Sequence, residues 1–141
     1  MQDDVAMVVA KTMDGGLFMP GTCNYGGVMD SPWYTRLGKQ GSIIFQLYYN
    51  NANFFNAYST VQTLDGGFIL AGRHQGTGAI ERIDALGNVL WFKIYNGVNY
   101  FSSIIQTSDG GFAALAQRGV DGGYIGLFKL DAAGDISWEY N

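Results

Sequence analysis

Short runs of alternating apolar and polar residues, separated by glycine-containing turns, make up most of this sequence. Residues Tyr124–Leu130 are a clear case, because two sets of side chains alternate along the run with a period of two. That period is typical of a β-strand, whose successive side chains point to opposite faces of a sheet. The pattern therefore predicts an all-β protein built from short strands.

The last third of the chain predicts a complete sheet of four antiparallel strands. Asp109-Gly110 lies between the first two strands, and an Asp-Gly pair supplies the positive φ angles that a tight hairpin turn requires. Gly134 has the same role before the last strand. The four expected strands are Ser102–Thr107, Phe112–Gln117, Tyr124–Leu130 and Ile136–Tyr140.

Two motifs recur in register and divide the chain into three copies of one unit of roughly 45 residues. The tripeptide Asp-Gly-Gly begins at Asp14, Asp65 and Asp109. The second motif, a turn that ends in glycine, occurs at Leu37–Gly41, Ile83–Gly87 and Leu130–Gly134. We therefore predict one repeat domain over residues 1–141, with repeats at about 5–50, 57–97 and 101–141. The strands expected in the first two copies are Val5–Thr12, Leu17–Gly21, Trp33–Leu37, Ile43–Tyr48, Tyr58–Thr63, Phe68–Gly72, Ala79–Asp84 and Val89–Tyr95, and residues 22–32 are expected to form a long connection.

Tandem units of four short antiparallel strands predict β-propeller-like blades. Apolar residues at one matched position of the fourth strand support this, namely Phe45, Trp91 and Trp138. Three blades do not close a ring, because propellers have about four to eight. The sequence leaves open a piece of a longer propeller, a homo-oligomer such as a dimer with six blades, a three-fold closed fold such as a β-trefoil, barrel or prism, and an open array.

Composition excludes several classes of partner. Charged residues make up 14% of the chain, the net charge is −4, and no run of Lys or Arg occurs, so nucleic acid and anionic membrane surfaces are not expected as partners. No apolar run approaches the roughly 20 residues of a spanning helix, so membrane insertion is not expected either. The single cysteine, Cys23, cannot form an intramolecular disulfide.

Candidate catalytic chemistry is sparse. With one histidine, His74, and one cysteine, no zinc site of the usual ligand set can form. The repeated Asp14, Asp65 and Asp109 are expected to lie far apart and to cap their turns, whereas a glycosidase needs two carboxyls within about 5 to 10 Å. We therefore expect no catalytic residues, no metal and no cofactor, and a protein that is not an enzyme; an active site built across blades or subunits is the alternative.

The segments Ile105–Phe112 and Phe128–Trp138 resemble the repeat of secreted, propeller-type proteins of Bacteroidetes and of archaeal surface proteins, with its Thr-Ser-Asp-Gly-Gly-Tyr and Lys-Leu-Asp-x-x-Gly-Asn-x-x-Trp units. The resemblance implies an extracellular or cell-surface protein and no shared catalytic residues. The first copy departs from the repeat, with Gly38 where the others have Asp84 and Asp131. No signal peptide is visible at the start of the chain, which leaves a cytosolic protein or a removed signal as explanations. The resemblance favours removal.

The connections between repeats are rich in aromatic and asparagine residues and are expected to share one rim with the loops between second and third strands. Aromatic faces beside amide groups suit a carbohydrate or a protein ligand. The alternative is that these aromatics fill gaps between blades. The function predicted is a non-enzymatic extracellular module for binding or scaffolding; the alternative is a structural subunit that assembles into a ring or fibre through its blade faces. The candidate ligand-binding residues are Tyr25, Trp33, Tyr49, Asn51, Arg73, His74, Asn99, Tyr100 and Arg118.

Overall fold

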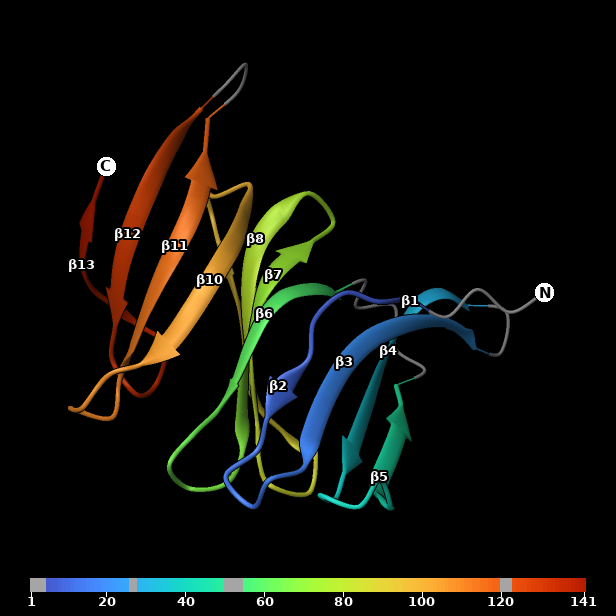
Figure 1. Cartoon of the computed structure of the whole chain (residues 1–141). Coiled ribbons are helices and arrows are strands. Elements are labelled where there is room, and N and C mark those ends of the chain that lie inside the picture. Colours follow the sequence, from blue (N-terminus) through green and yellow to red (C-terminus); the bar gives the residue numbers. More distant parts are fainter. Residues whose placement is uncertain (1–4, 26–27, 50–54, 120–122) are drawn as a thin grey trace.

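The computed structural model describes residues 5–25, 28–49, 55–119 and 123–141, and it arranges them as three antiparallel sheets (Figure 1). No residue within these ranges is helical. Each sheet keeps its strands in sequence order, so the chain completes one sheet before it begins the next. The all-β prediction of three consecutive four-stranded units is confirmed.

The strands form three sheets in chain order. Sheet 1 contains β1 (Val5–Ala6), β2 (Ala10–Lys11), β3 (Leu17–Tyr25), β4 (Val28–Leu37) and β5 (Ile43–Tyr48), with β1 and β2 forming two pieces of one first strand because both pair with β3. Sheet 2 contains β6 (Phe55–Gln62), β7 (Phe68–His74), β8 (Thr77–Ile83) and β9 (Val89–Tyr95). Sheet 3 contains β10 (Tyr100–Gln106), β11 (Phe112–Arg118), β12 (Tyr124–Leu130) and β13 (Ile136–Tyr140).

The longest hairpin, β3–β4, extends beyond the prediction. Residues 22–32 were predicted to form a connection. Instead Cys23 pairs with Ser31, and the two strands continue to Tyr25 and Val28. Pro32 lacks only its N–H group, and its carbonyl still accepts a hydrogen bond from the Tyr49 amide at 2.9 Å. Proline therefore lies inside this strand without ending it.

The Asp-Gly-Gly turns all lie at one end of the sheets, here called the lower rim; the opposite end is the upper rim (Figure 1). In sheet 2, Asp65 accepts hydrogen bonds from the Gly67 amide at 3.2 Å and from the Thr63 hydroxyl at 2.6 Å. The middle glycine, Gly66, has a φ of 86°, which favours glycine. The equivalent bonds occur at Asp14 and Asp109. The predicted turn-capping role of these aspartates is confirmed.

A basic residue of the third strand completes each lower-rim turn. Arg82 binds Asp65 with its Nη2 atom 2.6 Å from both carboxylate oxygens. In sheets 1 and 3 the corresponding pairs are Arg36 with Asp14, at 3.1 Å, and Lys129 with Asp109, at 2.8 Å. Each repeat therefore carries its own ion pair between the first turn and the third strand.

The core consists of two separate layers, one on each side of sheet 2. Phe68 stacks on Phe18 of sheet 1, with ring centroids 3.9 Å apart. The next residue along the strand, Ile69, points the other way and belongs to the cluster shared with sheet 3. We call the side of a sheet that covers the following sheet its forward face and the opposite side its backward face. Sheet 2 is buried on both faces.

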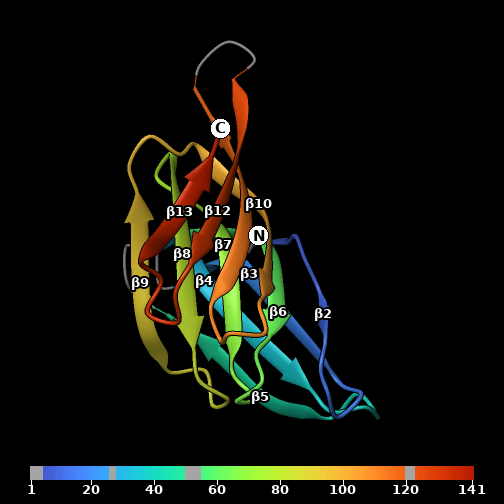
Figure 2. The ribbon, with the colours of Figure 1, turned by 90° about the vertical axis from the view of Figure 1, so that its left-hand side faces the viewer.

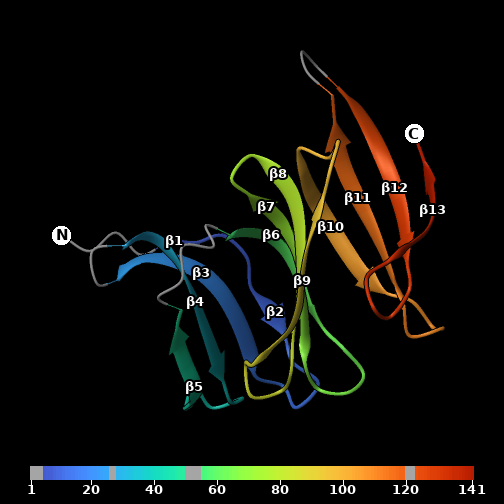
Figure 3. The ribbon, with the colours of Figure 1, turned by 180° about the vertical axis from the view of Figure 1, so that it is seen from behind.

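The three sheets stack in series as β-propeller-like blades. The first strands lie close together, since β10 contacts β6 and β7, and β6 contacts β2 and β3. Figure 3 shows the molecule from the opposite side, where the last strands of the three sheets, β5, β9 and β13, are spread apart. Sheets 1 and 3 both pack on sheet 2, which is the arrangement of blades rather than that of a trefoil barrel.

Substitution of Gly134 tests the packing between sheets 2 and 3. A Cβ atom at Gly134 would lie 2.7 Å from the Trp91 ring, whereas a Cβ at Gly110, which has the same φ of 82°, would meet no atom within 4 Å. Both Gly→Ala changes incur about 1–2 kcal/mol of backbone strain, and Gly134→Ala should cost about 1–3 kcal/mol more from overpacking. Urea denaturation of the two variants measures the difference. Equal destabilisation would contradict the close contact of this turn with Trp91.

Candidate functional site

The connection from sheet 2 to sheet 3 lies beside the loop between the second and third strands of sheet 3. The Asn99 side chain, in the connection from sheet 2 to sheet 3, donates a hydrogen bond to the Gly119 carbonyl at 2.5 Å. Arg118, at the end of β11, donates to the Gly97 carbonyl at 3.2 Å. These bonds join the connection between repeats to the loop between second and third strands. Both segments belong to the upper rim.

Arg118 is held by contacts within its own sheet. Its guanidinium lies 5.9 Å from the ring centroid of Tyr124 and 5.4 Å from that of Phe128. It also forms an ion pair with Glu139 at 3.2 Å and a hydrogen bond with Asn141 at 2.7 Å. Because its charge is already paired, Arg118 is less available to an anionic ligand than its sequence position suggests.

Tyr49 joins sheet 1 to sheet 2. Its hydroxyl donates a hydrogen bond to the Gly87 carbonyl, and its ring packs against Tyr34 with centroids 5.1 Å apart. Burial raises the pKa of the Tyr49 hydroxyl to about 12. Tyr95 makes the equivalent bond to Gly134 one repeat later, at 2.7 Å. The repeated tyrosine therefore links neighbouring sheets through a hydrogen bond.

The remaining predicted residues are distributed over different parts of the molecule. Arg73 is exposed, and His74 beside it is half-buried, with its ring edge-on to Phe92 at 5.5 Å. Trp33 lies beside Tyr48 in sheet 1, with ring centroids 6.5 Å apart. Tyr25 is the last residue of β3. Asn51 lies outside the described residues.

Tyr100 packs against a tyrosine of the neighbouring sheet. Its ring meets that of Tyr58 edge-on, with centroids 5.6 Å apart and planes at 89°. Both rings are half-buried, and they come from adjacent first strands, β10 and β6. The pair lies where β10 begins, beside the middle of β6.

Tyr58 was not identified by sequence analysis. The pairing of β6 with β7 shifts by one residue between Ala57 and Ser59, so Tyr58 is the extra residue of a β-bulge. A bulge changes the direction of a side chain, and alternation alone does not locate it. The corresponding bulge of sheet 3 contains Ser102, so comparison of the repeats does not mark an aromatic at this position.

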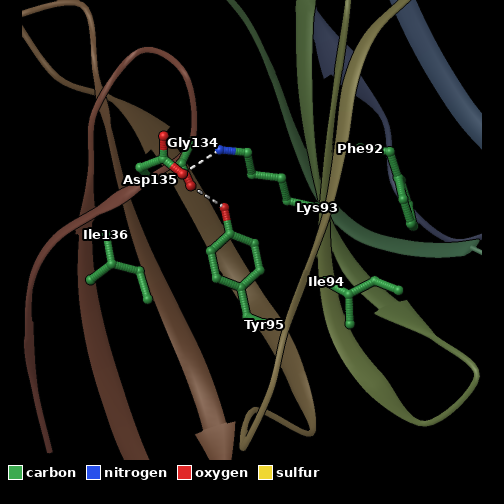
Figure 4. Close-up of a pocket in the computed structure, with 7 residues that line it drawn as sticks. All are labelled: Phe92, Lys93, Ile94, Tyr95, Gly134, Asp135 and Ile136. Atoms are coloured by element: carbon green, nitrogen blue, oxygen red, sulfur yellow. Dashed lines mark hydrogen bonds and ion pairs between the residues drawn. The ribbon is translucent and has the colours of Figure 1, made fainter.

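A groove of about 470 Å³ lies between β9 and the turn that joins β12 to β13 (Figure 4). Lys93 crosses it to Asp135, with a distance of 2.5 Å between Nζ and Oδ1. The Tyr95 hydroxyl crosses it to the Gly134 carbonyl, and burial raises the pKa of that hydroxyl. The polar groups of the groove bind one another across the two sheets, so this is the outer edge of a packed interface.

The turn aspartates of the described part of the chain lie in three separate sheets. No group of three or more His, Cys, Asp or Glu side chains that could hold a metal ion occurs in that part of the chain. Hydrogen bonds from Lys129 and Thr107 lower the pKa of Asp109, and a hydrogen bond from Thr63 is the main cause of the lowered pKa of Asp65. Each of these carboxylates is held ionised within its own repeat.

Glu81 is the exception, because it is buried between sheets 1 and 2. The Tyr34 hydroxyl donates a hydrogen bond to it, and this bond favours the ionised carboxylate. Burial has the larger effect and raises the pKa of Glu81 to about 7. The equivalent residues of the other repeats are Thr35 and Phe128, neither of which is ionisable. Glu81 is therefore peculiar to this one interface.

Within the described ranges, no helix is long and apolar enough to span a lipid bilayer. A comparison of the sequence with protein-family models and with curated proteins finds no match.

Solved structures do match the fold. A protein of unknown function from Bacteroides caccae aligns with 98% of this chain at 12% identity and a TM-score of 0.61. The WD40 domain of Neurospora crassa Pan2 aligns with 96% at 11% identity and a TM-score of 0.57. A streptogramin B lyase is more distant, at 12% identity and a TM-score of 0.47.

These comparisons support the fold alone, because the identities are low. The WD40 domain is a β-propeller, so the chain is similar to propeller blades over nearly its whole length. It spans 46% of the Bacteroides caccae chain and 49% of the Pan2 chain, or about half of each. The predicted β-propeller-like repeat is thereby confirmed.

Replacement of Glu81 by glutamine should change how stability depends on pH. The folded pKa of about 7 lies above the ordinary value of 4.5, so the folded state binds the proton more tightly than the unfolded state does. The stabilisation of the folded state by this proton is complete below pH 4.5 and is lost as the pH rises to about 7. The free energy of unfolding falls by about 3 kcal/mol over this range. Glu81→Gln should lack this decline and be the more stable protein at pH 8.

Urea denaturation from pH 4.5 to pH 8 provides the measurement. Glu139→Gln, in exposed β13, is the matched control and should retain the decline of the wild-type protein. If Glu81→Gln declined in parallel with the wild-type protein, Glu81 would not be the group responsible.

Proposed function

We propose that this chain is a non-enzymatic, extracellular or cell-surface repeat module for binding or scaffolding. Its ligand is a carbohydrate or another protein, which binds at the aromatic and asparagine-containing upper rim. The observation that carries the proposal is the half-buried pair of Tyr58 and Tyr100, whose rings meet at 5.6 Å. Tyrosine offers a flat apolar face and a hydroxyl, a combination that suits sugar rings and protein surfaces alike.

The distribution of polar groups supports a binding role over catalysis. The three turn carboxylates each bind a basic residue of their own repeat, and His74 packs against Phe92. General acid–base catalysis needs a side chain that is positioned against the reacting atoms and can exchange a proton with them. The extracellular or cell-surface location follows from the resemblance of Ile105–Phe112 and Phe128–Trp138 to the repeats of exported propeller-type proteins.

A second candidate function is structural assembly into a ring or fibre through the sheet faces. It is favoured by apolar side chains that remain exposed on the outward faces of sheets 1 and 3, among them Leu17 and Leu115. Inside the molecule, the equivalent faces are covered by a neighbouring sheet. A homo-oligomer would cover the outward faces in the same way, as would further repeats of a longer chain.

Removal of one tyrosine ring tests the rim proposal. On a glycan array, the wild-type protein should bind at least one class of glycan, and Tyr100→Ala should bind that class about tenfold more weakly because a stacking face is lost. Tyr140→Ala, which removes an exposed tyrosine of the outer strand β13, is the control and should bind as the wild-type protein does. An array without binding above background would exclude the carbohydrate ligand.

A further inference from the structure

The two interfaces inside the molecule use the same positions. On the forward face, Phe18 of sheet 1 corresponds to Ile69 of sheet 2, counted from the Asp-Gly-Gly motif. On the backward face, Phe68 of sheet 2 corresponds to Phe112 of sheet 3. Phe18 meets Phe68 at the first interface, and Ile69 and Phe112 share the core cluster of the second. The molecule therefore contains one type of interface, used twice.

The forward face of sheet 3 has the same apolar character but no described sheet against it. Figure 2 looks toward this face. Leu127 occupies the position of the fully buried Ile80, and Leu115 that of the fully buried Ala71. Leu115 is 41% exposed and Ile105 is 55% exposed. A depression of about 230 Å³ lies between these side chains.

The backward face of sheet 1 is the complementary surface. Leu17 occupies the position of Phe68 and is 41% exposed, and Met19 occupies the position of Leu70. Val9 and Ile44 are also exposed on this sheet, and a depression of about 290 Å³ lies among residues of the interrupted first strand and Met19. The molecule thus exposes a forward face at one end and a backward face at the other.

The outer turns show the same complementarity. Gly134 packs against Trp91 of the preceding sheet, and Gly87 packs against Leu47, so that a Cβ atom at either glycine would lie within 2.7 Å of the neighbouring side chain. The equivalent glycine of sheet 1, Gly41, has no atom within 4 Å of such a Cβ. Trp138 of sheet 3 corresponds to Trp91 and is 45% exposed. Sheet 3 therefore exposes the Trp138 ring with no described turn packed on it, and sheet 1 exposes the Gly41 turn with no described ring beneath it.

We infer that a second copy of this chain packs head to tail, with the backward face of its sheet 1 on the forward face of sheet 3, and that two copies close a ring of six sheets. The inference rests on assembly through the sheet faces, the second candidate function. In the docked pair, Leu17 lies opposite Ala113, as Phe68 lies opposite Phe18, and the Gly41 turn covers Trp138.

Two observations support a second copy as the occupant. The exposed faces continue an interface that the chain already forms twice, position for position. The chain also spans 46% and 49% of the two propeller structures it matches, so two copies come close to the length of either one. A head-to-tail contact of this kind forms a closed ring when its rotation returns to the start, and each closed pair contains two identical joints.

The charge on the sheet 3 forward face is compatible with docking. Lys129, the basic residue of the sheet 3 forward face, is bound to Asp109 at 2.8 Å. The equivalent pair of Arg82 and Asp65 exists at an interface that is already covered, where the Arg82 side chain is only 6% exposed. A second copy therefore covers an ion pair whose partners are already matched.

Light scattering after gel filtration at micromolar concentration measures the mass of the chain, which is 15.4 kDa for one copy. The expected mass is twice that value, and Leu115→Asp should reduce it to one copy by placing a charge on the forward face. Leu86→Asp is the matched control, because Leu86 is exposed in a turn of the lower rim, and it should remain a dimer. Circular dichroism verifies that both variants are folded. A wild-type protein that remained monomeric would overturn both the assembly and the inference.

Cysteine cross-linking distinguishes the head-to-tail arrangement from other assemblies. Leu17→Cys and Ala113→Cys should each resist oxidative cross-linking alone and should form a covalent dimer when the two variants are mixed. The wild-type protein, whose Cys23 is buried, is the control. A cross-link in either variant alone would mean that like faces meet, which would overturn the inference while assembly stood. Masses above two copies would show an open fibre and overturn the closed ring.

Discussion

Each sheet of this protein is a single layer with two apolar faces, and it remains folded in water only where neighbours cover those faces. Sheet 2 satisfies this constraint completely. Phe68 and Ile69 follow one another along β7, point in opposite directions, and are both fully buried. Sheets 1 and 3 satisfy it on one side. The core clusters, the ties between sheets and the open faces at the two ends all follow from this division.

Polar chemistry in the molecule mainly serves the turns and the joints between sheets. An aspartate, a threonine hydroxyl and a basic residue close each lower-rim turn, so three charged pairs recur at the same place in three repeats. Tyr49 and Tyr95 each bind the outer turn of the following sheet. The ion pairs thereby stabilise turns within a sheet, and the tyrosine hydroxyls fix one sheet relative to the next. The pair of Tyr58 and Tyr100 lies outside these repeated ties.

The fold could be predicted from sequence because its determinants are local and repeated. Asp-Gly-Gly and the second glycine turn determine where strands end. The three copies, aligned in register, give consistent positions for the strands. The length of β3–β4 could not be predicted, because pairing of Cys23 with Ser31 outweighs the strand-breaking tendency of Gly21 and Pro32. The roles of the upper-rim residues could not be predicted either, because they depend on contacts distant in sequence. Asn99 and Arg118 became structural through bonds to Gly119 and Gly97, and the bulge at Tyr58 has no signature in the alternation.

The two faces of a sheet are unlike one another, and this gives the molecule a polarity similar to that of a filament with a plus end and a minus end. Each repeat carries both halves of the joint, one for its predecessor and one for its successor. A gene duplication that inserts a whole repeat therefore brings a matching surface for each neighbour, whereas a change to one face requires a compensating change in the next. Proteins built in this way can lengthen by copying more easily than they can diversify at their joints.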